Sequence, residues 1–255
     1  ENPQCVITTT PAPNDLTRRL VKRTNTIITR GSTFDNAANL SEVAVAQLKD
    51  KYEGTRLGRQ ELYGEVLDDL EGALWGYGVI DQNRVSLENL PEFNRIVVAI
   101  DPSVTNNEDS DETGIIVAAR CNNNNYYVLE DGSHKNTPDG WARKAVSLFH
   151  TYNADRLIAE VNNGGDLVEK VIRTVDINIP YSSVHASRGK LVRAEPIAAL
   201  YEQSRVHHVG IHKELEDQMV SYTPNSRKSP DRMDALVWAL TELSASTGQP
   251  MWRIS

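Results

Sequence analysis

RIVVAID, at residues 95–101, is a short apolar run that ends in an acidic residue, and RLIAE, at residues 156–160, has the same form. Runs of this length, bounded by polar residues, are typical of buried β-strands. Two further strands are expected at 114–120 and 126–130, and the short polar connections between the first three predict that they pair antiparallel. From residue 95 onward the strands alternate with helical patterns, which predicts an α/β domain. Helices are expected at 141–152, 165–174, 190–204, 213–222 and 230–243, with a further strand at 182–186.

This order of elements is the layout of a ribonuclease H-like fold, a mixed five-stranded sheet flanked by helices, and other mixed α/β folds share the same number of elements. In that layout the first and fourth strands are central neighbours, so Asp101 and Glu160 are expected to end side by side. Residues 206–209 are expected to form only a short extended piece. Upstream, residues 1–90 are expected to be mostly helical, and we place the domain boundary near Leu90 and Pro91.

Composition limits the class of protein. The chain has 255 residues, 39% of them apolar and 24% charged, which suits one large or two modest domains with a real core. No apolar stretch approaches the roughly 20 residues that span a bilayer, and no signal-peptide pattern is visible, so the protein is expected to be cytosolic. The net charge of -8 argues against coating nucleic acid by charge alone. It does not exclude a nuclease, because clustered carboxylates lower the charge without preventing a local basic track.

Two acidic residues stand at strand ends. Asp101 precedes Pro102, where the strand must stop; capping of the following turn is the alternative explanation. Glu160 closes a continuous apolar run, where an unpaired carboxylate would cost several kcal/mol to bury. A bound metal ion would offset that cost.

A third acidic position lies in SPDRMDALVWAL, residues 229–240, where Ser229 is a suitable N-cap. Asp231 falls in the first helical turn, where the helix dipole alone explains an acid. Asp234 shares a helix face with Asp231 and Trp238, and points either to solvent or into a site. We favour the site, and leave open which aspartate is the direct ligand.

These acids together predict an oxygen-only site for Mg²⁺ or Mn²⁺. Two such ions, about 3.5–4 Å apart, can activate a water and stabilise the leaving oxygen in phosphodiester cleavage. Asp101 would bridge both ions, and Glu160 and the C-terminal aspartates would each favour one. Lys190 would orient the water or steady the phosphate, although an ordinary surface lysine is equally consistent with the sequence.

Basic residues flank the last acidic segment in two groups. Solvated surface charge explains either group alone, whereas a site between them favours contacts to DNA phosphates. The candidate DNA-binding residues are Arg188, Lys190, Arg193, Arg227, Lys228 and Arg232.

The motifs occur in an order found in a known family. The segments concerned are RIVVAIDPS (95–103), TGIIVAAR (113–120), LIAEVNNGGDLVEKVI (157–172), the run from Ser183 to Gly210, and LEDQMVSYTPNSRKSPDRMDALVWALTEL (215–243). Together they resemble the C-terminal nuclease domain of the terminase large subunit of tailed bacteriophages and related prophages. The likeness covers roughly residues 91–245, so we assign 91–246 to the nuclease domain and 247–255 to a tail. CVITTTPAP, at 5–13, resembles the strand and threonine-rich coupling segment that closes the packaging ATPase, and 57–75 resembles the region joining the two domains.

The resemblance implies a metal-dependent endonuclease that cuts concatemeric double-stranded viral DNA at the start and end of head filling. It implies Mg²⁺ or Mn²⁺ as cofactor, the small terminase subunit and portal protein as partners, and the bacterial host cytosol as location. Carried over by position, the metal-binding acids are Asp101, Glu160 and Asp234, with Asp231 as an additional candidate and Asp166 as a weaker accessory one.

The chain departs from the family in one respect. It carries no G-x-x-x-x-G-K-[ST] loop, so no ATP hydrolysis is expected from it alone. We expect a fragment, a truncated gene product, or a motor whose ATPase is a separate chain. Two alternatives stay open: a Holliday-junction resolvase or transposase-like enzyme of the same fold, and a non-catalytic packaging-motor assembly module.

Overall fold

The computed structural model describes residues 5–8, 20–21, 23–52, 62–64, 72–102, 112–161, 165–187, 189–223, 226 and 229–245. The chain divides into two compact units, Glu1–Glu71 and Gly72–Ser255. The predicted tail at 247–255 lies outside the described residues.

The first unit carries the expected helical structure. The 3₁₀ helix η1 (Thr33–Asn39) begins with a capping box, in which the Ser32 hydroxyl accepts from the Asp35 amide and the Asp35 carboxylate accepts from the Ser32 amide. Helix α2 (Glu42–Tyr52) follows, and the Ser41 hydroxyl accepts a hydrogen bond from the Ala44 amide, as an N-cap does. Residues 5–8, the described part of the predicted coupling strand, form no strand.

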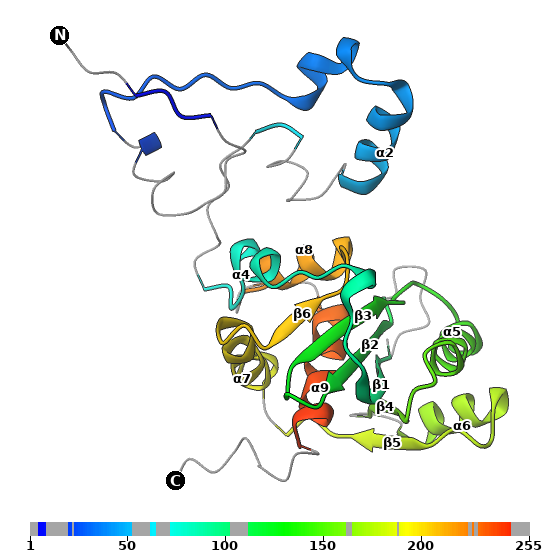
Figure 1. Cartoon of the computed structure of the whole chain (residues 1–255). Helices are drawn as coiled ribbons and strands as arrows, with labels where there is room; N and C mark the ends of the chain where they lie inside the picture. The colour runs from blue at the N-terminus through cyan, green and yellow to red at the C-terminus, as the bar shows by residue number, and fades with distance from the viewer. Residues whose placement is uncertain are drawn as a thin grey trace, which may run out of the picture. The chain divides into compact units, whose positions relative to one another are not determined.

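The second unit is built on one mixed sheet (Figure 1). Its order is β5-β4-β1-β2-β3-β6; β1, β2 and β3 pair antiparallel, and the other three contacts are parallel. The strands are β1 (Phe93–Asp101), β2 (Gly114–Cys121), β3 (Tyr126–Asp131), β4 (Arg156–Glu160), β5 (Tyr181–Val184) and β6 (Val206–His208). The sheet therefore has one strand more than predicted, because the extended piece at 206–209 pairs with β3.

Helices cover both faces of this sheet. Helices α5 (Pro138–Thr151) and α6 (Gly165–Val175) share one hydrophobic core with β1, β2 and β4. Helix α9 (Asp231–Ala245) lies along β1 and β2 and is buried over most of its length. Helices α7 (Lys190–Glu202) and α8 (Lys213–Ser221) both pack against α9. No helix in the described part of the chain is long and apolar enough to cross a lipid bilayer.

The register of the central strands brings two chain segments to the same edge. β1 and β4 run parallel with Ile100 opposite Ala159, so Asp101 and Glu160 each come next at the carboxyl ends of their strands. Ile100 and Ala159 belong to the core that α5 and α6 cover. Because side chains alternate along a strand, Asp101 and Glu160 face the other side, toward α9. The predicted adjacency of these two strands is confirmed.

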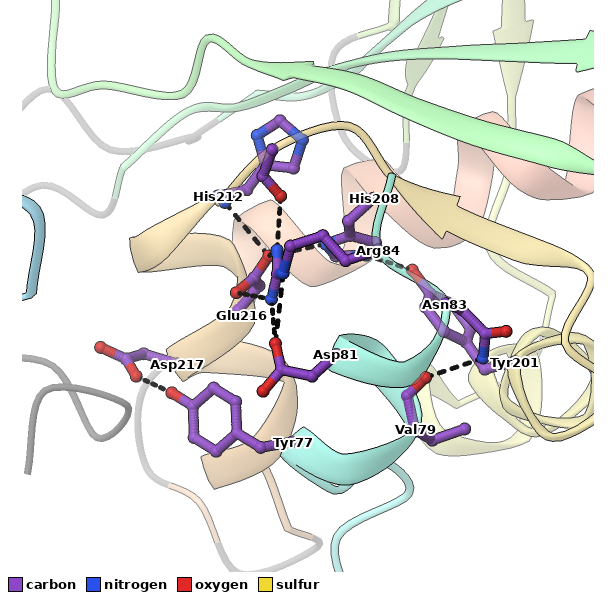
Figure 2. A network of polar contacts seen from close by, with 11 residues as sticks. Tyr77, Val79, Asp81, Asn83, Arg84, Tyr201, His208, His212, Glu216 and Asp217 are labelled. Atoms are coloured by element: carbon purple, nitrogen blue, oxygen red, sulfur yellow. Dashed lines mark hydrogen bonds and ion pairs between the residues drawn. The ribbon is translucent and has the colours of Figure 1, made fainter. Parts of the chain in front are cut away.

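The segment before β1 packs against α7, α8 and the edge strand β6, and Figure 2 shows the polar contacts it makes there. It contains helix α4 (Tyr77–Gln82) and the 3₁₀ helix η2 (Leu87–Asn89). The Arg84 guanidinium pairs with Glu216 of α8 at 2.6 Å and with Asp81, and Tyr77 donates a hydrogen bond to Asp217. Glu216 also contacts His208 of β6. The second compact unit, which begins at Gly72, includes this segment, and the domain boundary near Leu90 and Pro91 stays a prediction.

Candidate functional site

Asp101 and Glu160 form the strand edge of the site. Burial raises the pKa of the Asp101 carboxyl well above its usual value, and the charges of Asp234, Glu160 and Asp231 raise it further. Lys190 acts in the opposite direction. Asp101 therefore lies in a poorly solvated place, where the charges of the other three predicted acids disfavour its ionised form.

The start of α9 is pressed against β2 beside Asp101. Gly114 pairs with Asp101 in the β1–β2 ladder, and a Cβ atom built on Gly114 would lie 2.0 Å from the Asp231 carbonyl oxygen. Only glycine therefore permits the backbone of α9 to come this near to the strand. The close approach brings Asp231 and Asp234, both buried, to the strand edge that carries Asp101.

Asp234 is fully buried and is matched by two basic side chains from the start of α7. Arg193 Nη2 donates to Asp234 Oδ1 at 3.0 Å, and Lys190 Nζ forms an ion pair with Asp234 Oδ2. Lys190 also donates to Ser229 Oγ at 2.8 Å. Burial lowers the pKa of Lys190, but the charges of Asp234, Asp101 and Asp231 outweigh it and raise the pKa overall, so this ammonium stays charged.

Glu160 is held by a tryptophan and the same arginine. Trp238 Nε1 donates to Glu160 Oε2 at 2.5 Å, and Arg193 Nη2 lies 3.6 Å from that oxygen. The Arg193 Cζ atom lies 4.8 Å from the centroid of the Trp238 ring, a cation–π contact. Arg193 thus touches acids from β4 and α9 at once.

The donor set suits a hard divalent cation. Four carboxylates from β1, β4 and α9 converge, with no sulfur or imidazole ligand in the set, as Mg²⁺ and Mn²⁺ prefer. Among the described residues, however, no three His, Cys, Asp or Glu side chains are arranged as a ready cation cage. Lys190 and Arg193 supply positive charge among these carboxylates instead.

The predicted DNA-binding residues that the structure describes differ in their surroundings and in their exposure to solvent. Arg193 lies inside the site, with a side chain only 11% exposed. Arg232 is also buried, and its guanidinium pairs with Asp131 and Glu112, both at 2.5 Å. That pairing gives Arg232 a place in the packing of α9 rather than on an open phosphate track. Lys190 is the most exposed of the three.

Other predicted residues lie outside what the structure describes. These are Arg188, Arg227 and Lys228, and the side chain of Asp166 in the first turn of α6.

Two residues with clear roles in the geometry were not predicted from the sequence. Trp238 was not singled out as a site residue, although its position one helical turn after Asp234 already put it on the same face. Gly114 was not singled out, because its importance depends on pairing with Asp101 and on the path of α9.

Sequence comparison agrees with this architecture. Residues 98–243, more than half of the chain, match the family model of the terminase RNaseH-like domain. No curated protein sequence matches the chain.

Solved structures share the fold at low sequence identity. The nuclease domain of the P22 large terminase is 12% identical with a TM-score of 0.50, over 69% of this chain and 93% of that one. The nuclease domain of the Sf6 large terminase subunit gp2 is also 12% identical with a TM-score of 0.50, over 66% of this chain and 98% of that one. The large terminase of a thermophilic bacteriophage, solved in complex with ADP, is 13% identical with a TM-score of 0.50, over 82% of this chain. The match spans only 52% of that thermophilic phage protein, about half its length.

Proposed function

Since this chain belongs to the terminase RNaseH-like family, we propose that it is a divalent-metal-dependent endonuclease that cuts double-stranded DNA during viral genome packaging. The observation that carries the proposal is the convergence of Asp101, Glu160, Asp231 and Asp234 at one edge of the sheet. A buried cluster of like charges costs stability, and such clusters are retained at functional sites.

The four acids would hold Mg²⁺ or Mn²⁺. Bound there, the ions would supply an activated water and neutralise charge on the leaving oxygen, as in other two-metal phosphodiesterases. The negative charges of the other three acids all raise the pKa of the Asp101 carboxyl. Its deprotonation would therefore accompany metal binding.

Lys190 is the residue best placed to meet the phosphate. Its side chain is 35% exposed while its ammonium is anchored to Asp234 and Ser229, so it faces both the acids and the solvent. A fixed cation at this position would stabilise the charge that develops on the scissile phosphate. We propose that Arg188, two residues before Lys190, and Arg227 and Lys228, which precede α9, extend the contact along the DNA backbone.

The wider role follows from the family. We propose that the chain acts in the bacterial host cytosol with an ATPase, a small terminase subunit and a portal protein. Without a phosphate-binding loop of its own, it would cut DNA but not hydrolyse ATP.

Cleavage of supercoiled plasmid in Mn²⁺ or Mg²⁺ tests the proposal. The wild type is expected to nick and linearise the plasmid with little sequence preference, and EDTA should stop the reaction. The site variants are Asp101→Asn, Glu160→Gln, Asp231→Asn and Asp234→Asn, each expected to lose cleavage by about 100-fold or more. Asp139→Asn is a matched control, because Asp139 is exposed and, in the described part of the chain, pairs with Arg143 on its own helix.

Three outcomes would contradict the proposal. Undiminished cleavage by the four site variants would show that the assigned acids are not needed for cleavage. Strong preference for four-way junctions would favour a resolvase, and no cleavage by the folded wild type would favour a non-catalytic assembly module. Between Asp231→Asn and Asp234→Asn, the variant that loses more Mn²⁺ affinity identifies the direct ligand.

A further inference from the structure

Arg193 occupies a position that a catalytic nuclease would be expected to reserve for metal. Its Nη2 atom lies 3.0 Å from Asp234 Oδ1 and 3.6 Å from Glu160 Oε2, so one cationic group connects acids from two elements. A divalent ion held by Glu160 and Asp234 would compete with the guanidinium for these two carboxylates. The guanidinium therefore stands where it neutralises the acids before any ion binds.

The rest of its surroundings holds Arg193 in this place. The guanidinium lies over the Trp238 ring, and Trp238 in turn donates to Glu160. The side chain is only 11% exposed, which leaves little of it available to DNA. Arg193 thus contacts Asp234, Glu160 and Trp238, which are all residues of the acidic site.

Apart from its contacts with the acids, the position of Arg193 near the start of a helix is unfavourable for a basic residue. Lys190 and Arg193 begin α7, where no acidic residue occurs in the first turn, although a helix N-terminus favours acids over bases. Fully buried Asp234 offsets this cost by pairing with both. Removing the arginine would leave a buried carboxylate with only part of its compensation.

We propose that Arg193 is an internal counter-ion that divalent metal must displace, so that it sets the metal concentration at which the site is loaded. This inference rests on the proposed nuclease function and adds a specific role for one residue in it. Without metal, Arg193 would hold Glu160 and Asp234 together; with metal, its guanidinium would leave those oxygens. Arg193 is then a positioning residue and not a group that acts on the phosphate.

Mn²⁺ titration of the full chain without DNA tests the proposal by calorimetry and by thermal melting. Arg193→Gln is expected to bind Mn²⁺ about tenfold more tightly, because a positive charge a few ångströms from the ion is removed. The metal-free variant should melt at a lower temperature than the wild type and gain more on adding Mn²⁺. Arg193→Lys keeps the charge and should restore a dissociation constant near that of the wild type.

Arg95→Gln is the matched control. Arg95 lies in the same strand as Asp101, at the opposite end, where it pairs with Glu242 at 2.7 Å. The substitution removes the same charge far from the acids, so its Mn²⁺ affinity should equal that of the wild type. If Arg193→Gln and Arg95→Gln raise the Mn²⁺ affinity equally, the change in net charge alone explains the effect. That result would overturn the proposal.

Unchanged or weaker Mn²⁺ binding by Arg193→Gln would also overturn it. So would an equal loss of melting temperature with and without metal, which indicates a purely structural role. If Arg193→Gln does not fold, ¹⁵N-arginine NMR of the wild type decides: Mg²⁺ should shift the Arg193 Nε resonance and leave that of Arg84 in place. Failure of the wild type to bind Mn²⁺ or to cleave DNA would instead contradict the proposed function itself.

Discussion

Gly114→Ala tests whether the close approach of α9 to β2 builds the site. The added Cβ would lie 2.0 Å from the Asp231 carbonyl oxygen, 2.5 Å from its carbonyl carbon and 3.1 Å from Ala235 Cβ. The first two neighbours are backbone atoms, so no side-chain rotation relieves the clash. Because a Cβ contact below 3.0 Å is essentially never observed, strand and helix must separate by about 1 Å.

The expected cost is about 3 kcal/mol of unfolding free energy, the upper range for overpacking a core. For a domain of this size that corresponds to a fall of roughly 6–12 °C in melting temperature. The shift also moves Asp231 and Asp234 away from Asp101, and a misplacement of about 1 Å at a catalytic site reduces the rate by about 100-fold. Both effects are measurable, by urea unfolding and by plasmid cleavage at a temperature where the variant is folded.

Gly78→Ala is the control for this prediction. Gly78 lies exposed in α4, a Cβ atom added there would meet no described atom within 4 Å, and alanine favours a helix. That variant should gain up to about 0.5 kcal/mol and cut DNA as the wild type does. The reasoning is refuted if Gly114→Ala unfolds and cleaves like Gly78→Ala.

Three further predictions concern the site and the network behind it. Trp238→Phe removes the donor to Glu160 but keeps an aromatic ring, and should lower the unfolding free energy by about 1–3 kcal/mol and reduce plasmid cleavage; wild-type values for both would contradict the assigned contact. Burial raises the pKa of Glu216, but hydrogen bonds from His208 and Arg84 outweigh it and hold the pKa well below the ordinary value of 4.5. Its stabilisation is therefore complete above that pH and is lost as the pH falls below it. Glu216→Gln should cost about 3–5 kcal/mol at neutral pH and flatten the acid side of the stability profile in urea unfolding; an unchanged profile would count against this. Finally, Mn²⁺ affinity measured by calorimetry should rise with pH, because Asp101 must lose its proton to bind metal; a pH-independent affinity would contradict the raised pKa.

The sequence predicts the centre of the fold well. Apolar runs ending at Asp101 and Glu160 locate β1 and β4, and the short connections predict the antiparallel pairing of β1, β2 and β3, because strand burial and connection length are both visible in the chain. The adjacency of β1 and β4 was expected from the ribonuclease H-like layout of the elements, and the structure has it. The acids of α9 were found for the same reason, since helix periodicity puts Asp234 and Trp238 on one face.

Features that depend on distant contacts were harder to predict. β6 is three residues long, too short for a periodic signal, and exists because β3 pairs with it. The segment that contains α4 has a glycine-rich sequence, and its helix is supported by the ion pair between Arg84 and Glu216. Arg232 was expected at the surface as a DNA-binding residue, but it is buried. Its guanidinium forms ion pairs with Asp131 and Glu112, which the sequence does not reveal.

Crystals of the full chain soaked in Mn²⁺ give the most direct test of the central claim, that these acids form a metal-dependent nuclease site. The anomalous difference map should show manganese within bonding distance of the Asp101 and Glu160 carboxylates and of Asp231 or Asp234. Manganese bound only elsewhere, at a concentration that supports DNA cleavage, would contradict the account.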